Sequence, residues 1–194
     1  MTETGAQASN LNLPNVLTTL RIVMVPFFGW ALLQDGGDSV TWRLVAFTLF
    51  VLAMITDKID GDIARARGLI TNFGKIADPI ADKLLIGSAL VLLSILGELP
   101  WWVTILILVR EWGITALRFV VIRYGVMPAS RGGKLKTVVQ TVAIFLYILP
   151  LQAIAPWLGA VAFLVMMVAL AITLWTGVEY VIQAMRLRAA GRRA

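Results

Sequence analysis

The sequence predicts an all-α integral-membrane protein built from six transmembrane helices. Hydrophobic residues make up 59% of the 194 residues, and the mean hydropathy is +0.86. Ordinary soluble domains contain about 45–50% apolar residues. Six apolar stretches, each close to the length that crosses a bilayer, are separated by short segments that contain Gly, Pro or charged residues. These observations predict one helical bundle embedded in lipid.

Six spans follow from the apolar stretches, in chain order. They are 16–33, 40–65, 78–97, 101–123, 137–153 and 157–182. The breaks between them carry turn-forming sequences such as Asp35-Gly36-Gly37-Asp38 and Ala155-Pro156. We expect residues 1–13 to form a mobile N-terminal tail, residues 14–185 the six-helix membrane domain, and residues 186–194 a basic tail.

Basic residues predict the orientation of these spans. The net charge is +6, and the Lys and Arg residues concentrate after the second and fourth spans and in the C-terminal tail. The opposite connections hold only Arg43 as a basic residue. Because cytoplasmic loops carry the excess of Lys and Arg, both termini are expected in the cytoplasm, and the membrane is expected to be the plasma membrane.

The composition excludes several kinds of chemistry. The chain contains neither Cys nor His, so disulfides, thiolate nucleophiles and a Ser-His-Asp triad are excluded. A zinc site is disfavoured, since zinc prefers nitrogen and sulfur ligands. The side chains that could act as acids, bases or metal ligands are therefore mainly those of Asp, Glu, Lys, Arg and Tyr.

Four aspartates stand out at the cytoplasmic ends of the second and third spans. Asp57 and Asp60 are three residues apart, and Asp78 and Asp82 are four apart, so each pair shares one helix face. The apolar runs 44–56 and 84–96 beside them measure about 20 Å as helix, which places the carboxylates near the inner headgroup level. Clustered anions at this depth need a cation, and oxygen-only ligands favour Mg²⁺ or Mn²⁺.

The alternative is that these aspartates are helix caps or partners of neighbouring lysines. Asp78 precedes Pro79, a pair typical of a helix start. Asp62 faces away from the stripe of Asp57 and Asp60, so we assign it no role in the site. The neighbouring lysines are Lys58, Lys75 and Lys83.

The motif from Asp57 to Asp82, D-x-x-D-G-x-x-A-R-x8-G-x3-D-x3-D, resembles the signature of the CDP-alcohol phosphatidyltransferase family. The resemblance implies a metal-dependent enzyme with six transmembrane helices that forms a homodimer. It implies that the four aspartates hold one or two divalent ions, Mg²⁺ or Mn²⁺. It also implies that Asp82 takes the proton from the hydroxyl of the acceptor alcohol.

The resemblance further implies a set of contacts to the cytidine-diphosphate lipid. Three small residues would let the nucleotide approach the helices, an arginine would contact its phosphates, and a threonine would contact the nucleotide. The segment 14–18 resembles the part of the family that lies over the cytidine. The residues at these positions are Asn15, Thr18, Gly61, Ala64, Arg65, Thr71 and Gly74.

Cations in the fourth and fifth spans suggest a phosphorylated acceptor. Arg110 and Arg118, with Lys134 and Lys136, can line a cationic cavity near the metal, because intramembrane charges normally face a bundle interior. Their patterns, R-E-x6-R and K-x-K-T, resemble the branch of the family whose acceptor is sn-glycerol 3-phosphate. The implied reaction joins CDP-diacylglycerol to that acceptor and gives phosphatidylglycerol phosphate and CMP.

Other functions stay open at this stage. A sibling enzyme of the same family would use phosphatidylglycerol or inositol phosphate as its acceptor. An ion transporter would also carry intramembrane Asp and Arg, although its charges would be expected nearer the midplane than these aspartates. A lipid-binding scaffold without catalysis is a third possibility. Positive-inside topology and contact with lipid headgroups could account for several of the arginines.

Overall fold

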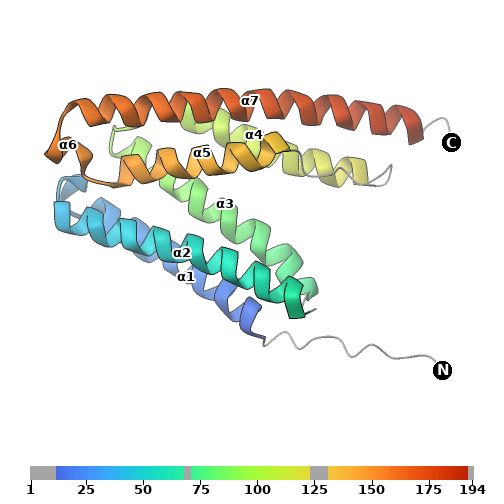
Figure 1. Cartoon of the computed structure of the whole chain (residues 1–194), viewed down its shortest axis with the longest axis horizontal. Helices are drawn as coiled ribbons and strands as arrows, with labels where there is room; N and C mark the ends of the chain where they lie inside the picture. The colour runs from blue at the N-terminus through green and yellow to red at the C-terminus, as the bar shows by residue number, and fades with distance from the viewer. Residues whose placement is uncertain (1–11, 68–70, 123–130, 192–194) are drawn as a thin grey trace. The chain divides into compact units, whose positions relative to one another are not determined.

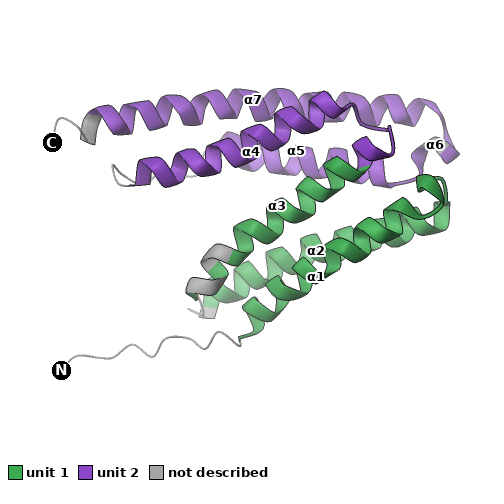
Figure 2. Cartoon of the chain, turned by 180° about the vertical axis from the view of Figure 1, so that it is seen from behind, with its two compact units in different colours: residues 1–92 green, residues 93–194 purple. Residues whose placement is uncertain are grey.

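The computed structural model describes residues 12–67, 71–122 and 131–191, and every regular element within them is a helix (Figure 1). The predicted all-α class is therefore confirmed. The chain divides into two compact units, residues 1–92 and 93–194 (Figure 2). The elements are α1 (Leu13–Leu33), η1 (Gln34–Gly37), α2 (Val40–Arg67), α3 (Asn72–Ile95), α4 (Trp101–Val121), α5 (Arg131–Ile148), α6 (Leu151–Ile154) and α7 (Trp157–Gly191).

In the first unit, α1 begins and ends with local signals that the sequence carries. The side chain of Asn12 caps the helix by accepting a hydrogen bond from the backbone N–H of Asn15 at 3.0 Å. Beyond α1 the chain reverses through η1, where Asp35 and Gly36 adopt positive φ values of 51° and 64°. Arg43 then donates from Nε to the carbonyl of Gly37, which fixes the start of α2 against this turn.

The core of the first unit lies between α1 and α2, with α3 packed against α1. Phe28 and Phe50 bring their ring centroids to 5.4 Å, and fully buried alanines allow the helices to approach closely. A Cβ atom added at Gly29 would lie 3.2 Å from Leu92, so glycine permits the contact between α1 and α3. The packing holds the C-terminal half of α2 and the N-terminal half of α3 beside α1.

In the second unit, α4 and α5 both pack against α7. The turn before α4 uses Gly97, which has a positive φ of 76°. Ser94 and Thr104 join their hydroxyl groups across this turn at 2.7 Å. The interior of the unit is lined by small and aliphatic side chains, including Val103, Ile107 and Ala143.

Several predicted span boundaries are wrong, and α7 continues to Gly191, well beyond the predicted end of its span at residue 182. The predicted span 137–153 is broken in the structure, since α5 ends at Ile148 and the short α6 begins at Leu151. Pro150 lies at the break, because proline cannot donate a backbone hydrogen bond and disfavours helix in the residue before it. The third helix begins at Asn72 and not at Asp78, so Pro79 lies inside α3 and is not its first residue.

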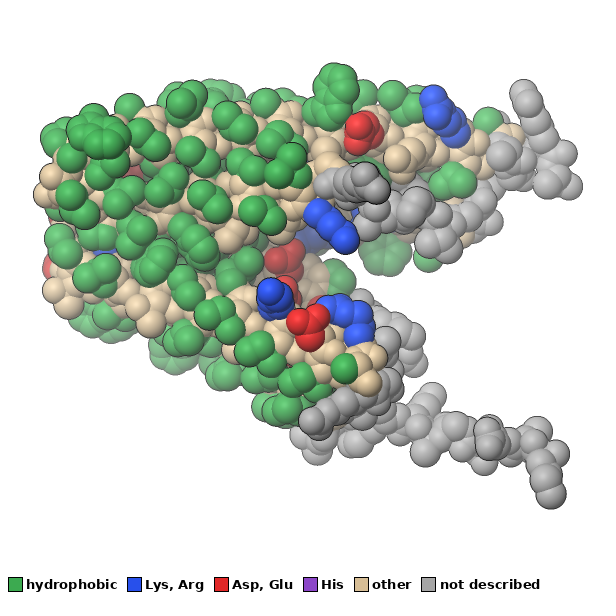
Figure 3. Space-filling view, viewed as in Figure 1, with side chains coloured by type: hydrophobic (Ala, Val, Ile, Leu, Met, Phe, Trp, Pro, Cys, Tyr) green, Lys and Arg blue, Asp and Glu red, His purple; other side chains and the backbone are tan. Residues whose placement is uncertain are grey.

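The outer surfaces are those of a membrane protein. Three of the six long helices described are long and apolar enough to cross a bilayer, over Leu13–Gly37, Val40–Ala66 and Trp157–Ala189. Large apolar side chains face outward, with Phe119 72% exposed and Trp175 71% exposed. In Figure 3 hydrophobic side chains cover most of the visible length of α2, α5 and α7, and charged ones lie toward the C-terminal ends of α2 and α7. Lipid is the solvent that accommodates such a surface.

Candidate functional site

The acidic face of α2 meets an arginine from α1. Asp57 and Asp60 lie one turn apart near the C-terminal end of α2, as their spacing predicts. Arg21 is fully buried, with Nη1 2.5 Å from Oδ1 of Asp57 and Nη2 bonded to Oδ2 of Asp60. The side chain of Asp60 is only 3% exposed, whereas that of Asp57 is 38% exposed. A buried guanidinium needs counter-charges, and these two carboxylates supply them.

Thr18 links the carboxylates of α2 and α3. Its hydroxyl donates to Oδ1 of Asp78 at 2.6 Å and also lies 3.3 Å from Oδ2 of Asp60. Because a hydroxyl carries one proton, the shorter contact is the stronger hydrogen bond. Side chains from α1 thus bring together Asp57, Asp60 and Asp78, three of the four aspartates that the sequence singled out.

The N-terminal end of α1 is tied to the start of α3 by a second polar group. The amide of Asn15 and the hydroxyl of Thr71 exchange hydrogen bonds of 2.9 and 3.0 Å. The backbone N–H of Gly74 donates to the same hydroxyl at 3.0 Å. A Cβ atom at Gly74 would lie 3.0 Å from Oδ1 of Asn15, so glycine is needed for this approach. Asn15, Thr71 and Gly74 were all expected at the nucleotide, and they form one contact group.

Of the other expected contacts to the nucleotide lipid, Thr18 lies on α1, and Gly61, Ala64 and Arg65 lie on the last turns of α2. Arg65 and Asp62 form an exposed ion pair of 2.7 Å. A Cβ atom at Gly61 would lie 3.2 Å from the guanidinium of Arg65, so the missing side chain makes room for that group. Ala64 is half-buried. Arg65 therefore lies exposed near the C-terminal end of α2, where its guanidinium pairs with Asp62.

The carboxylates of this region could bind a hard divalent cation, but in the structure two of them pair with Arg21. Asp82 lies one turn after Asp78 on α3 and is half-buried. Within the described ranges, no group of three or more His, Cys, Asp or Glu side chains is placed closely enough to hold a metal ion. One oxygen of Asp57 and one of Asp60 are directed at Arg21. The carboxylate oxygens are ligands of the kind that Mg²⁺ and Mn²⁺ prefer.

In the second unit, a partly buried network surrounds Glu111. Arg110 donates from Nη1 to Oε1 of Glu111 at 3.0 Å, and Nζ of Lys136 donates to the same oxygen at 2.6 Å. Arg110 also donates to the carbonyl of Thr173 at 2.9 Å and to the hydroxyl of Thr176 at 2.7 Å. Two of the four cations expected at the acceptor therefore meet on one carboxylate, and Arg110 is anchored to α7.

The other two expected cations lie differently. Arg118 places its guanidinium carbon 4.8 Å from the ring centroid of Tyr180 on α7, a cation–π contact. Lys134 is exposed at the start of α5. Gln140, one turn after Lys136, is only 2% exposed, and neither polar atom of its side chain has a hydrogen-bond partner among the described residues. An unsatisfied buried amide costs about 1–3 kcal/mol, which marks this position as one that can accept a polar ligand.

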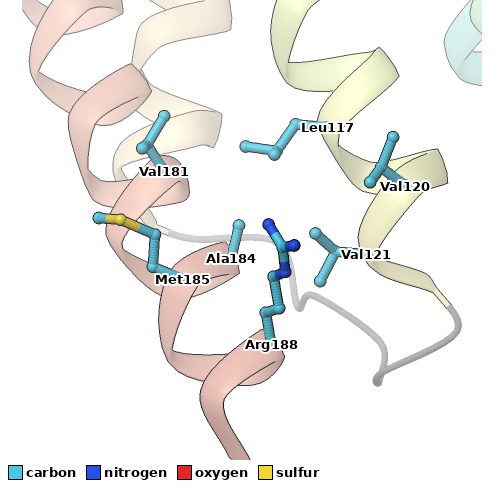
Figure 4. A pocket seen from close by; sticks show the side chains of 7 residues that line it. All are labelled: Leu117, Val120, Val121, Val181, Ala184, Met185 and Arg188. Atoms are coloured by element: carbon cyan, nitrogen blue, oxygen red, sulfur yellow. The ribbon is translucent and has the colours of Figure 1, made fainter. Parts of the chain in front are cut away.

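A small apolar pocket of about 180 Å³ lies between the C-terminal parts of α4 and α7 (Figure 4). Its walls are aliphatic, and Arg188 extends its guanidinium between them. The sequence did not lead us to expect a pocket here, and its lining carries no group for acid, base or metal chemistry. The lining residues are Leu117, Val120, Val121, Val181, Ala184, Met185 and Arg188.

Sequence reasoning did not single out Arg21 or Gln140. Arg21 is a lone charge within the apolar stretch 16–33, and such intramembrane charges usually mark function. That signal could have identified Arg21, although not its partners on α2. Gln140 carries no such signal, because a glutamine near the end of a span is compatible with the headgroup region.

The sequence of this chain is similar to those of several known proteins. The family model of CDP-alcohol phosphatidyltransferases matches residues 11–175. A protein of Mycobacterium tuberculosis (strain ATCC 25618 / H37Rv) named "Probable phosphatidylglycerophosphate synthase" is 56% identical over 187 residues, which cover 95% of this chain and 88% of that protein. A "CDP-diacylglycerol--glycerol-3-phosphate 3-phosphatidyltransferase" of Bacillus subtilis (strain 168) is 38% identical over 183 residues, covering 87% and 93%. A protein of the same name from Rickettsia typhi is 40% identical over 174 residues, covering 87% and 94%.

Proposed function

Because the chain belongs to the CDP-alcohol phosphatidyltransferase family, as its aspartate motif predicted, we propose that it transfers the phosphatidyl group of CDP-diacylglycerol to sn-glycerol 3-phosphate. The products are phosphatidylglycerol phosphate and CMP, so the reaction belongs to phospholipid biosynthesis. The observation that carries the proposal is the 56% identity, over 95% of the chain, to a relative named for this synthesis. The relatives from Bacillus and Rickettsia are named for the same donor and acceptor.

The proposal includes a divalent ion, Mg²⁺ or Mn²⁺, in one or two copies at the acidic face of the first unit. The residues that would hold it are Asp57, Asp60, Asp78 and Asp82. When bound, such an ion supplies positive charge that neutralises the pyrophosphate and stabilises the departing CMP. The contacts of Thr18 with Asp60 and Asp78 support this assignment, because they draw carboxylates of α2 and α3 toward one another.

The chain's own residues would position the nucleotide lipid. The group of Asn15, Thr71 and Gly74 would lie at the cytidine, where a glycine allows backbone and ligand to approach closely. Thr18, Gly61 and Ala64 would line the approach to the phosphates, and the exposed guanidinium of Arg65 would bind them. The acyl chains would stay in the lipid that covers the apolar outer surface of the helices.

The chemical step would be a single in-line displacement. Asp82 would accept the proton of the acceptor's hydroxyl group as its oxygen attacks the lipid-side phosphorus. A new P–O bond forms to the acceptor, and the P–O bond to the cytidine monophosphate breaks. CMP departs with that electron pair. Asp82 suits this role because it lies one helical turn from Asp78, next to the other proposed metal ligands.

The acceptor phosphate would be bound by the cations of the second unit. Arg110 and Lys136 pair with the carboxylate of Glu111. The four proposed cations, Arg110, Arg118, Lys134 and Lys136, outnumber that carboxylate, which leaves an excess of positive charge for a dianionic phosphate. Gln140 offers unsatisfied hydrogen-bonding groups one turn below Lys136, and these fit the hydroxyl groups of glycerol. Arg118 would face the ligand while its flank rests on Tyr180.

The proposal also covers the cellular setting. The enzyme would be a homodimer in the plasma membrane, with both termini and the active site on the cytoplasmic side. The distribution of basic residues supports this orientation, because positive charge is retained on the cytoplasmic face. The family resemblance of the motif is the support for the homodimer.

A direct test supplies the purified, lipid-reconstituted protein with CDP-diacylglycerol and one acceptor at a time. CMP release is expected with glycerol 3-phosphate and either Mg²⁺ or Mn²⁺, and loss of release is expected after chelation with EDTA. Inositol phosphate and phosphatidylglycerol serve as matched acceptors. Release with one of them in place of glycerol 3-phosphate would assign a sibling activity. No release with any acceptor, together with ion flux into the vesicles, would favour the transporter.

A further inference from the structure

Arg21 occupies a place that a divalent ion would also be drawn to. It lies in the first helix of the first unit, is 0% exposed, and reaches Oδ1 of Asp57 and Oδ2 of Asp60. Among the described residues, its Nε makes no hydrogen bond. The polar contacts of this guanidinium are therefore the two carboxylates, and a buried charge of this kind is stable only while such partners remain.

A bound metal ion would compete with Arg21 for the oxygens of these two carboxylates. Each gives Arg21 one oxygen, and the same two residues are proposed metal ligands. A guanidinium and a divalent ion also repel each other strongly across a few ångströms of poorly solvated space. Binding of the ion therefore has to weaken or displace the contacts of Arg21, and removal of the ion allows them to re-form.

We propose that Arg21 is a tethered counter-cation of the acidic site. It holds Asp57 and Asp60 together when no divalent ion is bound, and it gives up their oxygens when the ion binds. Arg21 is thus a positioning residue that keeps the empty site folded and lowers its affinity for metal. This inference rests on the proposed metal site of the phosphatidyltransferase, which can be tested separately.

The test measures Mn²⁺ affinity by isothermal titration of the purified full-length protein without substrates. The change Arg21→Gln removes the competing charge, so the dissociation constant for Mn²⁺ should fall by about tenfold or more. The same variant should unfold at a lower temperature than the wild type in EDTA, and Mn²⁺ should recover most of that loss. A merely structural arginine would lower the unfolding temperature equally with and without metal.

Two variants serve as controls. Arg43→Gln removes a second buried arginine of the first unit, which bonds to the carbonyl of Gly37 at the start of α2 and interacts with Asp38, and it should leave Mn²⁺ affinity unchanged. Arg21→Lys keeps the charge, so its Mn²⁺ affinity should stay near that of the wild type. Equal gains in affinity for Arg21→Gln and Arg21→Lys would contradict a charge-based role.

Weaker or unchanged Mn²⁺ binding by Arg21→Gln would overturn the proposal, as would a variant that stays unfolded at saturating Mn²⁺. A variant that folds with Mn²⁺ and unfolds when EDTA removes it would support the proposal. The wild-type protein separates this inference from the proposed function. If the wild type binds Mn²⁺ and releases CMP while Arg21→Gln gains no affinity, only the role of Arg21 fails.

Discussion

At the scale of single residues, a substitution at Gln140 distinguishes a structural role from a role in binding the acceptor. Its side-chain amide is buried and unsatisfied among the described residues, so its retention costs free energy that a ligand could recover. The change Gln140→Met preserves the shape. We expect the unfolding temperature to hold or rise, the apparent KM for glycerol 3-phosphate to rise about tenfold, and the KM for CDP-diacylglycerol to stay unchanged. Thermal unfolding and steady-state kinetics check these expectations.

The same substitution at Gln183 is the matched control. Gln183 lies on α7, and its Oε1 atom also lacks a partner in the described part of the chain. Gln183→Met should leave both KM values unchanged, because no proposed ligand group is assigned to that position. A Gln140→Met variant that is less stable and binds glycerol 3-phosphate normally would show that Gln140 is structural.

Single residues also show what the sequence could and could not reveal. The spacing of Asp57 with Asp60, and of Asp78 with Asp82, is local, so their shared faces could be predicted. The contacts of Arg21 and Thr18 join residues 39 and 60 positions apart. Helical periodicity does not determine which faces of different helices meet, so these partners became visible only in the folded unit.

At the scale of elements, Arg110 holds α4 against α7. It donates to the carbonyl of Thr173 and the hydroxyl of Thr176, and its side chain is only 10% exposed. A Cβ atom at Gly177 would lie 3.2 Å from Cγ of Arg110, so α7 is shaped to receive this side chain. The sequence suggested an acceptor ligand at this position, whereas the contacts show a structural anchor as well.

We therefore expect Arg110→Met to destabilise the protein by about 3 kcal/mol, since it leaves polar groups of α4 and α7 without their partner. Arg118→Met is the control on the same helix. It loses a cation–π contact with Tyr180, and that loss is expected to cost about 1 kcal/mol. Thermal unfolding of the two purified variants distinguishes them, and equal losses would argue against the anchoring role of Arg110.

Some helix boundaries follow from the local sequence, and others depend on tertiary contacts. The break at Pro150 has a local cause that a proline rule could have identified. Asp78 and Pro79 read locally as a helix start, yet α3 continues through them from Asn72. Proline inside a helix removes one backbone hydrogen bond. The bond between Thr18 and Asp78 is a tertiary contact beside this proline, and no local sequence rule predicts it.

At the scale of the whole molecule, the two units carry different proposed duties. The first unit contains the four aspartates and the residues assigned to the nucleotide lipid, and the second contains the cations assigned to the acceptor phosphate. Both units expose apolar side chains outward, as lipid-embedded helices require. The composition already predicted this surface, because no soluble core could enclose so many apolar residues.

The central claim is that the acidic face of the first unit performs metal-dependent phosphatidyl transfer. It is tested most directly by comparing CMP release by the wild type and Asp82→Asn in lipid, with CDP-diacylglycerol, glycerol 3-phosphate and Mn²⁺. We predict that Asp82→Asn unfolds at nearly the wild-type temperature yet releases CMP at least about a thousandfold more slowly, because the hydroxyl loses its proton acceptor and the ion loses a ligand. Release at the wild-type rate by this folded variant would contradict the account.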